Sequence, residues 1–257
     1  MRIIIVTILM MVGLSNVAFC QNSRISNRNT IGWFNYFGTF KVSKKIGIHT
    51  EYQFRRTELV SSRKQGLLRV GLNYQLNPKM DARVGYAWIE TYPYGDIPIN
   101  GMGRTFTEHR TFQMLTLTDK IAAFGLSHRF MLEQRWVGRY SSTNVSKEDQ
   151  FPFLNRFRYM FRVQLPFKGD VIKNKTAYMA AYNEIFLGFG KNVNENVFDQ
   201  NRVGLLIGYR INDRLRIEGG YLNQILQLGR EVDSRNVFQY NNGFIINANF
   251  NIDFTKK

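Results

Sequence analysis

The sequence predicts an all-β protein, a transmembrane antiparallel β-barrel. Between residues 31 and 254 we identify about eleven segments of roughly ten to fourteen residues in which apolar and polar side chains alternate. A tilted strand crosses a bilayer in about 9–11 residues, with apolar side chains on lipid and polar side chains in the lumen. No long apolar run follows the N-terminus, so membrane-spanning helices are excluded.

The final segment shows the alternation most clearly. Phe244, Ile246 and Phe250 share one face with Phe254, while Asn247 and its polar neighbours form the other. A soluble β-sandwich is the competing interpretation, but sandwich strands are usually about 5–6 residues long. All five prolines lie between the segments or at their ends, as expected where nothing in lipid replaces a lost ladder hydrogen bond.

The predicted strands follow one another with turns between them. They cover 31–42, 46–57, 67–76, 81–91, 105–117, 121–137, 153–165, 176–188, 202–211, 215–226 and a closing segment that ends at Phe254. Short turns alternate with longer loops at 59–65, 92–104, 138–151, 189–200 and 227–240. This alternation is typical of short periplasmic turns and longer outer loops.

The pattern leaves two numbers of strands open. Bacterial barrels have even strand numbers, whereas the pattern shows eleven segments. We therefore expect about twelve strands, with residues 22–30 adding a poor first strand. Ten is the alternative if one segment is misread.

The N-terminus has the features of a secretory signal. Arg2 is followed by the apolar run Ile3 to Leu14, and Ala18 and Cys20 occupy the small-residue positions before a cut at Gln21. We predict a signal peptide at 1–20 and one barrel domain at 21–257, in the outer membrane. A lipid-modified Cys20 is the alternative, against which Phe19 argues. Cleavage leaves no cysteine, which excludes disulfide and thiolate chemistry.

The chain is strongly basic, with a net charge of +16. Export argues against nucleic acid as a partner, and the charges form no basic helix or tail. The partners we expect are outer-membrane lipids that include anionic lipopolysaccharide, the barrel-assembly machinery and a small anionic solute.

Arginines dominate the face predicted to line the lumen. The predicted solute path comprises Arg129, Glu133, Arg135, Arg156, Arg158, Arg162, Glu108, Arg110, Glu184 and Arg202. Arg156, Arg158 and Arg162 share a strand face that carries no acid, so they could guide an anion. The alternative is an Arg–Glu network that satisfies itself and fills the barrel.

The sequence offers little for catalysis. His49 falls on a lumen face, His128 on a lipid face, and His109 in a strand of unclear register; no serine lies in a nucleophile motif. We predict no enzyme, no cofactor and no metal site. A lipid-modifying hydrolase or acyltransferase remains an alternative.

Several segments in this order resemble the family catalogued as DUF2490. They are EYQFRR, TEHRTFQ, LSHRFMLEQRW, NRFRYMF, YNEIF and DQNRVGLLIGYRIND. The resemblance implies an outer-membrane barrel of a Gram-negative bacterium and no particular activity. From the arginine-lined lumen we expect a porin-like narrow channel or binding barrel for small anionic solutes. The alternative is a closed structural or anchoring barrel that binds a partner through its outer loops.

Overall fold

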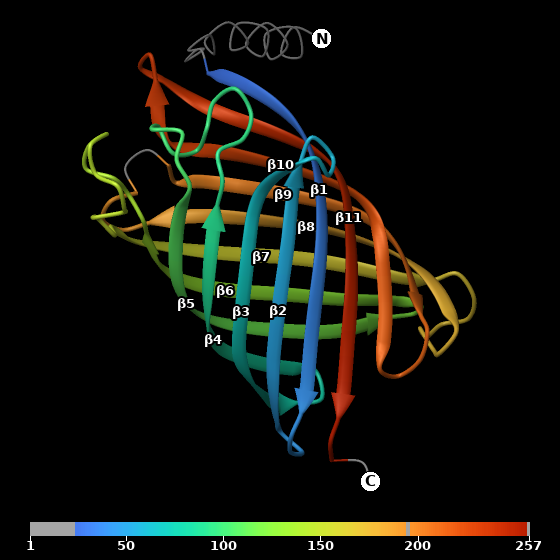
Figure 1. The fold of residues 1–257 in the computed structure, drawn as a ribbon. Helices are drawn as coiled ribbons and strands as arrows, with labels where there is room; N and C mark the ends of the chain where they lie inside the picture. Colours follow the sequence, from blue (N-terminus) through green and yellow to red (C-terminus); the bar gives the residue numbers. More distant parts are fainter. Residues whose placement is uncertain (1–23, 194–195, 256–257) are drawn as a thin grey trace, which may run out of the picture.

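The computed structural model describes residues 24–193 and 196–255, which form a closed β-barrel of eleven strands (Figure 1). The strands are β1 (Ile25–Lys41), β2 (Ile46–Thr57), β3 (Ser62–Asn77), β4 (Met80–Thr91), β5 (Phe106–Ile121), β6 (Phe124–Val137), β7 (Phe153–Pro166), β8 (Thr176–Phe189), β9 (Phe198–Arg210), β10 (Leu215–Val232) and β11 (Arg235–Asp253). No helix long and apolar enough to span a bilayer occurs in the described part of the chain. The signal peptide predicted at 1–20 lies outside the described residues.

Each strand pairs antiparallel with its neighbours in sequence, and β1 closes the barrel by pairing parallel with β11. The parallel stretch runs from Ile25 opposite Val237 to Lys41 opposite Asp253. The expectation of twelve strands, or ten, is therefore wrong. Residues 25–30 extend β1 rather than forming a strand of their own, and one parallel pair lets an odd number of strands close.

The β1–β11 seam brings two backbones into close contact. A Cβ atom at Gly243 would lie 1.7 Å from the carbonyl oxygen of Ile31, so only glycine fits there. Side-chain amides add to the seam, since Asn29 donates to Asn241 at 2.9 Å and Asn35 donates to Asn247 at 2.8 Å.

The two ends of the barrel differ. We call the end with segments 92–105, 138–152 and 190–197 the long-loop end, and the end with 42–45, 78–79, 122–123, 167–175 and 211–214 the short-turn end. The predicted strict alternation fails in two places. The expected loop at 227–240 is instead a hairpin with its turn at Asp233 and Ser234, which both have positive φ, and the loop expected at 59–65 shrinks because β3 begins at Ser62.

The predicted strand faces agree with the structure. On β7, Arg156 and Arg158 point inward and are buried, whereas Phe161 on the outer face is 36% exposed. The inner face also holds apolar clusters, of which the largest includes Ile31, Trp33 and Tyr178. The dyad pattern thus assigned side chains to the correct face of this strand.

We predict that Gly243→Ala opens or strains the seam, because the added methyl group meets the Ile31 backbone. The free energy of unfolding should fall by about 1–3 kcal/mol or folding should fail. Urea titration of the refolded protein measures this. Gly219→Ala on β10 is the matched control, since its new Cβ would lie 3.8 Å from the nearest atom. Equal stability of both variants would contradict the seam's dependence on glycine.

Candidate functional site

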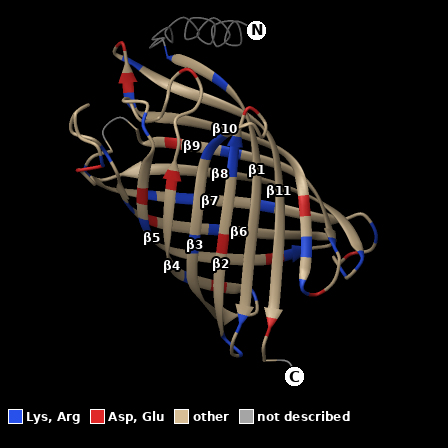
Figure 2. Cartoon of the chain, in the orientation of Figure 1, with Lys and Arg blue, Asp and Glu red and all other residues tan. Residues whose placement is uncertain are grey.

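The strands place a charged layer across the barrel interior. All ten residues of the predicted solute path lie on the inner face; Arg129, Arg135 and Arg162 are partly buried and the other seven are buried. Figure 2 shows that basic and acidic residues lie along the strand walls and not only in the loops.

Glu133 on β6 is the centre of this layer and is fully buried. Its carboxylate lies 2.6 Å from Arg156 Nη2 and 2.8 Å from Arg158 Nη1, both on the neighbouring strand β7. Arg110 at 3.7 Å and Arg69 at 3.9 Å approach the same carboxylate. Four guanidinium groups therefore surround one acid.

Five other buried acids each pair with at least one arginine. Glu184 lies 2.6 Å from Arg158 and 2.7 Å from Arg129. The other pairs join Glu108 to Arg110 and Arg135, Asp199 to Arg156, Glu218 to Arg162, and Glu51 to Arg69.

No acid shares the β7 face of Arg156, Arg158 and Arg162, but acids of other strands pair with all three. Their partners come from other strands: Glu133 stands opposite Arg156 in the β6–β7 ladder, and Glu218 reaches Arg162 from β10. A strand read alone cannot show such partners. The self-paired Arg–Glu network describes the centre of the barrel better.

The rings of Phe186 and Trp33 lie against arginines of this charged layer. Arg158 and Arg202 lie over the ring of Phe186, at 4.4 and 4.5 Å from its centroid. Arg55 and Arg202 lie over Trp33 at 4.0 and 4.9 Å. We call Trp33, Glu133, Arg158, Phe186 and Arg202 the central layer; its ring–guanidinium contacts and ion pairs cross the interior.

Two chambers lie on either side of the central layer. The long-loop chamber has a volume of about 410 Å³, and the short-turn chamber about 350 Å³. Both fall within the range of small-molecule sites. Arg202 lines both chambers and therefore stands at their junction.

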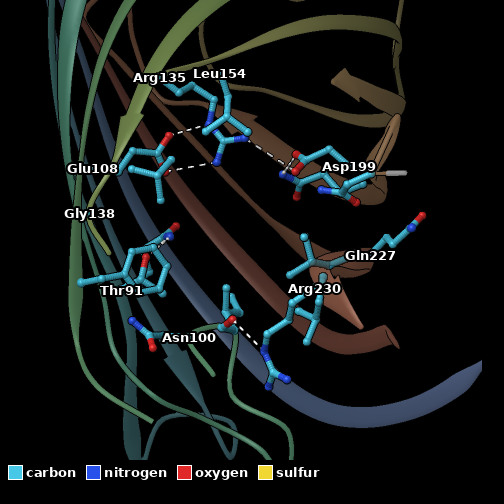
Figure 3. A pocket seen from close by; sticks show the side chains of 18 of the residues that line it. Thr91, Asn100, Glu108, Arg135, Gly138, Leu154, Asp199, Gln227 and Arg230 are labelled. Carbon is cyan, nitrogen blue, oxygen red and sulfur yellow. Dashed lines mark hydrogen bonds and ion pairs between the residues drawn. The ribbon is translucent and has the colours of Figure 1, made fainter. Parts of the chain in front are cut away.

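Positive charge predominates in the long-loop chamber. Its basic lining residues are Arg55, Lys64, Arg110, Arg135, Arg139, Arg156, Arg202 and Arg230, and its acids are Glu108 and Asp199. In Figure 3, Arg135 joins Glu108 and extends toward Asp199 on one wall, and Arg230 and Asn100 lie apart from them.

Arg55 and Lys64 differ from the other buried cations because neither forms an ion pair with a carboxylate of the described residues. Arg55 Nε donates to Gln53 at 2.9 Å, and Lys64 Nζ donates to Gln224 at 3.1 Å. Arg202 is similar, since its nearest acceptor is Gln200 at 3.0 Å while Glu184 is 3.9 Å away. Neutral amides thus leave the charges of Arg55 and Lys64 uncompensated and that of Arg202 only partly compensated.

Two β-bulges supply residues that the sequence pattern missed. The β2–β3 register shifts so that Arg55 faces Gln65 and Arg56 faces Arg63, which leaves Lys64 as the extra residue and turns it inward. The β8–β9 register shifts in the same way at Asp199, because Phe186 faces Gln200 and Leu187 faces Phe198. Bulges commonly redirect side chains at barrel rims and functional sites.

The loop at 92–105 folds over the mouth of the long-loop chamber. The Ile97 carbonyl accepts a hydrogen bond from Gln239 at 2.8 Å, and the Pro98 carbonyl accepts one from Arg230 at 2.7 Å. Tyr94 is buried beneath Lys64, whose Nζ lies 4.4 Å from the ring centroid. Burial raises the pKa of the Tyr94 phenol, which therefore stays protonated and donates to Gln239.

The histidines do not form a catalytic arrangement with the described serines or threonines. His49 points into the lumen and contacts Glu51 at 3.2 Å. His128 bonds to Tyr159 and His109 bonds to Tyr86, both on the outer face. No group of three or more potential metal ligands forms within the described ranges.

The sequence profile of the family described as "Protein of unknown function (DUF2490)" matches residues 30–235. No curated protein and no solved structure matches the chain.

We predict that Glu133→Gln destabilises the barrel by about 3–5 kcal/mol, because Arg156 and Arg158 each lose one of the two acids that compensate them in a buried site. Denaturant unfolding of the refolded protein measures the change. Asp119→Asn is the control, since it removes an ion pair with Lys79 that is exposed to solvent and should leave the unfolding midpoint unchanged. Equal midpoints for the two variants would show that the Glu133 network is not required for stability.

Proposed function

Since the chain belongs to the DUF2490 family, whose description gives no function, we propose from its geometry that it is an outer-membrane β-barrel that binds a small anionic solute in its long-loop chamber. The barrel-assembly machinery would insert it, and lipopolysaccharide would surround its long-loop end. The central layer would hold the solute on one side rather than let it diffuse freely through a channel.

The outer face supports a position in a membrane. Large apolar side chains are exposed on strands all around the barrel, among them Leu72, Val84, Leu205 and Ile207. A soluble protein rarely exposes a continuous apolar belt, whereas a lipid-facing wall requires one. The strands are 12 to 19 residues long, enough to cross a bilayer at a tilt.

The uncompensated charge of Arg55 and Lys64 is the observation that carries the proposal. Each buried cation stands beside neutral amides, and removal from water makes an unpaired charge unfavourable. An anion in the chamber would compensate both, and the nearby Arg202 guanidinium could bind a carboxylate or phosphate with two parallel hydrogen bonds. The bulge that turns Lys64 inward adds a charge where the regular strand would have none.

A closed structural barrel is the second candidate, and the Glu133 network favours it. That network satisfies itself without any ligand, as a filler would. The two candidates differ at Arg55 and Lys64, because a filler has no need of uncompensated cations. A lipid-modifying activity has weaker support, since no described hydroxyl group bonds to His49.

We predict that Phe161→Arg, on the outer face of β7, makes folding into lipid vesicles about 2–4 kcal/mol less favourable if the residue lies near the bilayer midplane. Phe167→Arg provides the same change in the short-turn segment that follows β7, where the cost should be about 0–1 kcal/mol. Equal folding of the two variants in vesicles would argue that Phe161 does not face the hydrocarbon core.

We predict that the refolded protein binds citrate, and that Lys64→Gln weakens the binding about tenfold because one charge-assisted hydrogen bond is lost. Isothermal titration calorimetry at constant ionic strength measures the dissociation constant. Lys147→Gln removes the same charge from an exposed position in the loop after β6 and should leave the constant unchanged. Absence of saturable heat with the unaltered protein would favour the closed structural barrel.

A further inference from the structure

The short-turn chamber lies between the central layer and the short-turn end, and none of the proposed long-loop contacts except Arg202 reaches it. Its wall includes His49 and Glu51 from β2, Arg129 from β6 and Arg216 from β10. It is therefore a separate compartment with its own polar groups.

Buried donors without a protein partner gather in this wall. Trp33 Nε1, the Nε atoms of Arg69, Arg129 and Arg216, and Asn249 Nδ2 are all buried and have no acceptor among the described residues. Every one of these side chains lines the short-turn chamber. Trp33 and Arg69 are 2% and 6% exposed, so bulk water does not reach them freely.

Such a gathering requires an acceptor. A buried donor that lacks a partner costs about 1–3 kcal/mol, and native proteins contain few of them. Among the unpartnered atoms of this chamber wall, the side-chain oxygen of Asn35 is an acceptor and the ring nitrogen of His49 can donate or accept. All the other unpartnered atoms of the wall are donors. A partner rich in acceptor atoms would satisfy these donors.

The excess of positive charge on the chamber wall indicates the class of ligand that it would bind. Seven arginines line the chamber, Arg69, Arg83, Arg129, Arg158, Arg162, Arg202 and Arg216, against the three acids Glu51, Glu184 and Glu218. The acids are already shared with Arg69, Arg158 and Arg162. Among the described residues, Arg83 donates to the neutral Asn73 and has no ion pair, and Arg216 also forms no ion pair with a carboxylate. An oxyanion supplies both the acceptors and the negative charge that the wall lacks.

We propose that the short-turn chamber is a second binding site, which takes a small oxyanion with carboxylate or phosphate groups. The ligand accepts hydrogen bonds from Trp33, Arg129 and Arg216, and it approaches from the short-turn end. This site goes beyond the solute site of the long-loop chamber and stands on different residues.

Trp33 provides a direct signal, because its indole nitrogen is one of the unpartnered donors. The chain has three tryptophans, and Trp88 and Trp136 can be replaced by phenylalanine to leave Trp33 as the only fluorophore. This protein, refolded in detergent micelles, is titrated with inorganic phosphate and, separately, with succinate, at constant ionic strength set by sodium chloride. We expect a saturable change in Trp33 emission with at least one of the two probes, and the probe that saturates identifies the group.

Two arginine substitutions test whether binding depends on a residue of the chamber wall. Arg216→Gln should raise the dissociation constant about tenfold. Arg210→Gln, which stands opposite Arg216 in the β9–β10 ladder but does not line the chamber, should leave it unchanged. If Arg216→Gln fails to fold, as judged by heat-dependent gel migration, Arg83→Gln takes its place.

The result also distinguishes the two chambers. Lys64→Gln should not weaken the Trp33 titration, because Lys64 lines only the long-loop chamber. A Trp33 response lost equally in Lys64→Gln would assign the signal to the other chamber and overturn the proposal. The absence of any saturable response to either probe would also overturn it and would assign the donors to water.

Discussion

The need to compensate buried charge governs this structure. Inside a closed barrel each arginine is removed from bulk water, and an unpaired ion there is strongly unfavourable. At the centre of the barrel Glu133 provides this compensation, since its carboxylate lies within 4 Å of four guanidinium groups. These four arginines pair with Glu133 and with the acids Glu51 of β2, Glu108 of β5, Glu184 of β8 and Asp199 of β9.

Closure of the barrel makes that compensation possible. The parallel β1–β11 pair leaves no free strand edge among the described strands, and it brings Trp33 of β1 into the interior beside Arg202 of β9. Most bacterial barrels reach closure with an even number of antiparallel strands. Here Gly243 allows the last strand to lie against Ile31 closely enough for a parallel pair to close the wall.

The sequence predicted the barrel and its faces because period-two alternation reports directly which side a residue occupies. Arg156 and Arg158 were assigned correctly to the interior on that basis. Which residue lies opposite on the neighbouring strand depends on the register of the two strands, and alternation within one strand does not show that register. The pairing of Glu133 with Arg156 could therefore not be predicted from the β7 sequence alone. The odd number of strands could not be predicted for a similar reason, because no local pattern shows that Ile25 pairs with Val237.

Bulges account for the residues that alternation missed at the candidate site. A bulge adds one residue to one strand, so strict alternation beyond it assigns the wrong face. Lys64 and Asp199 both occupy such positions, and both were expected in loops. The Asp233–Ser234 turn escaped because it lacks the Asn-Gly or Asp-Gly sequence that usually announces a two-residue hairpin.

Arg202 connects the electrostatics of the two chambers. Its guanidinium lies between Trp33 and Phe186 and forms part of both walls. Its nearest acid, Glu184, already bonds Arg129 and Arg158, so the charge of Arg202 is only partly compensated. An anion in either chamber would draw on the same guanidinium. Occupancy of one chamber should therefore weaken the attraction of the other for an anion, and this coupling follows from a shared charge without any movement of the barrel wall.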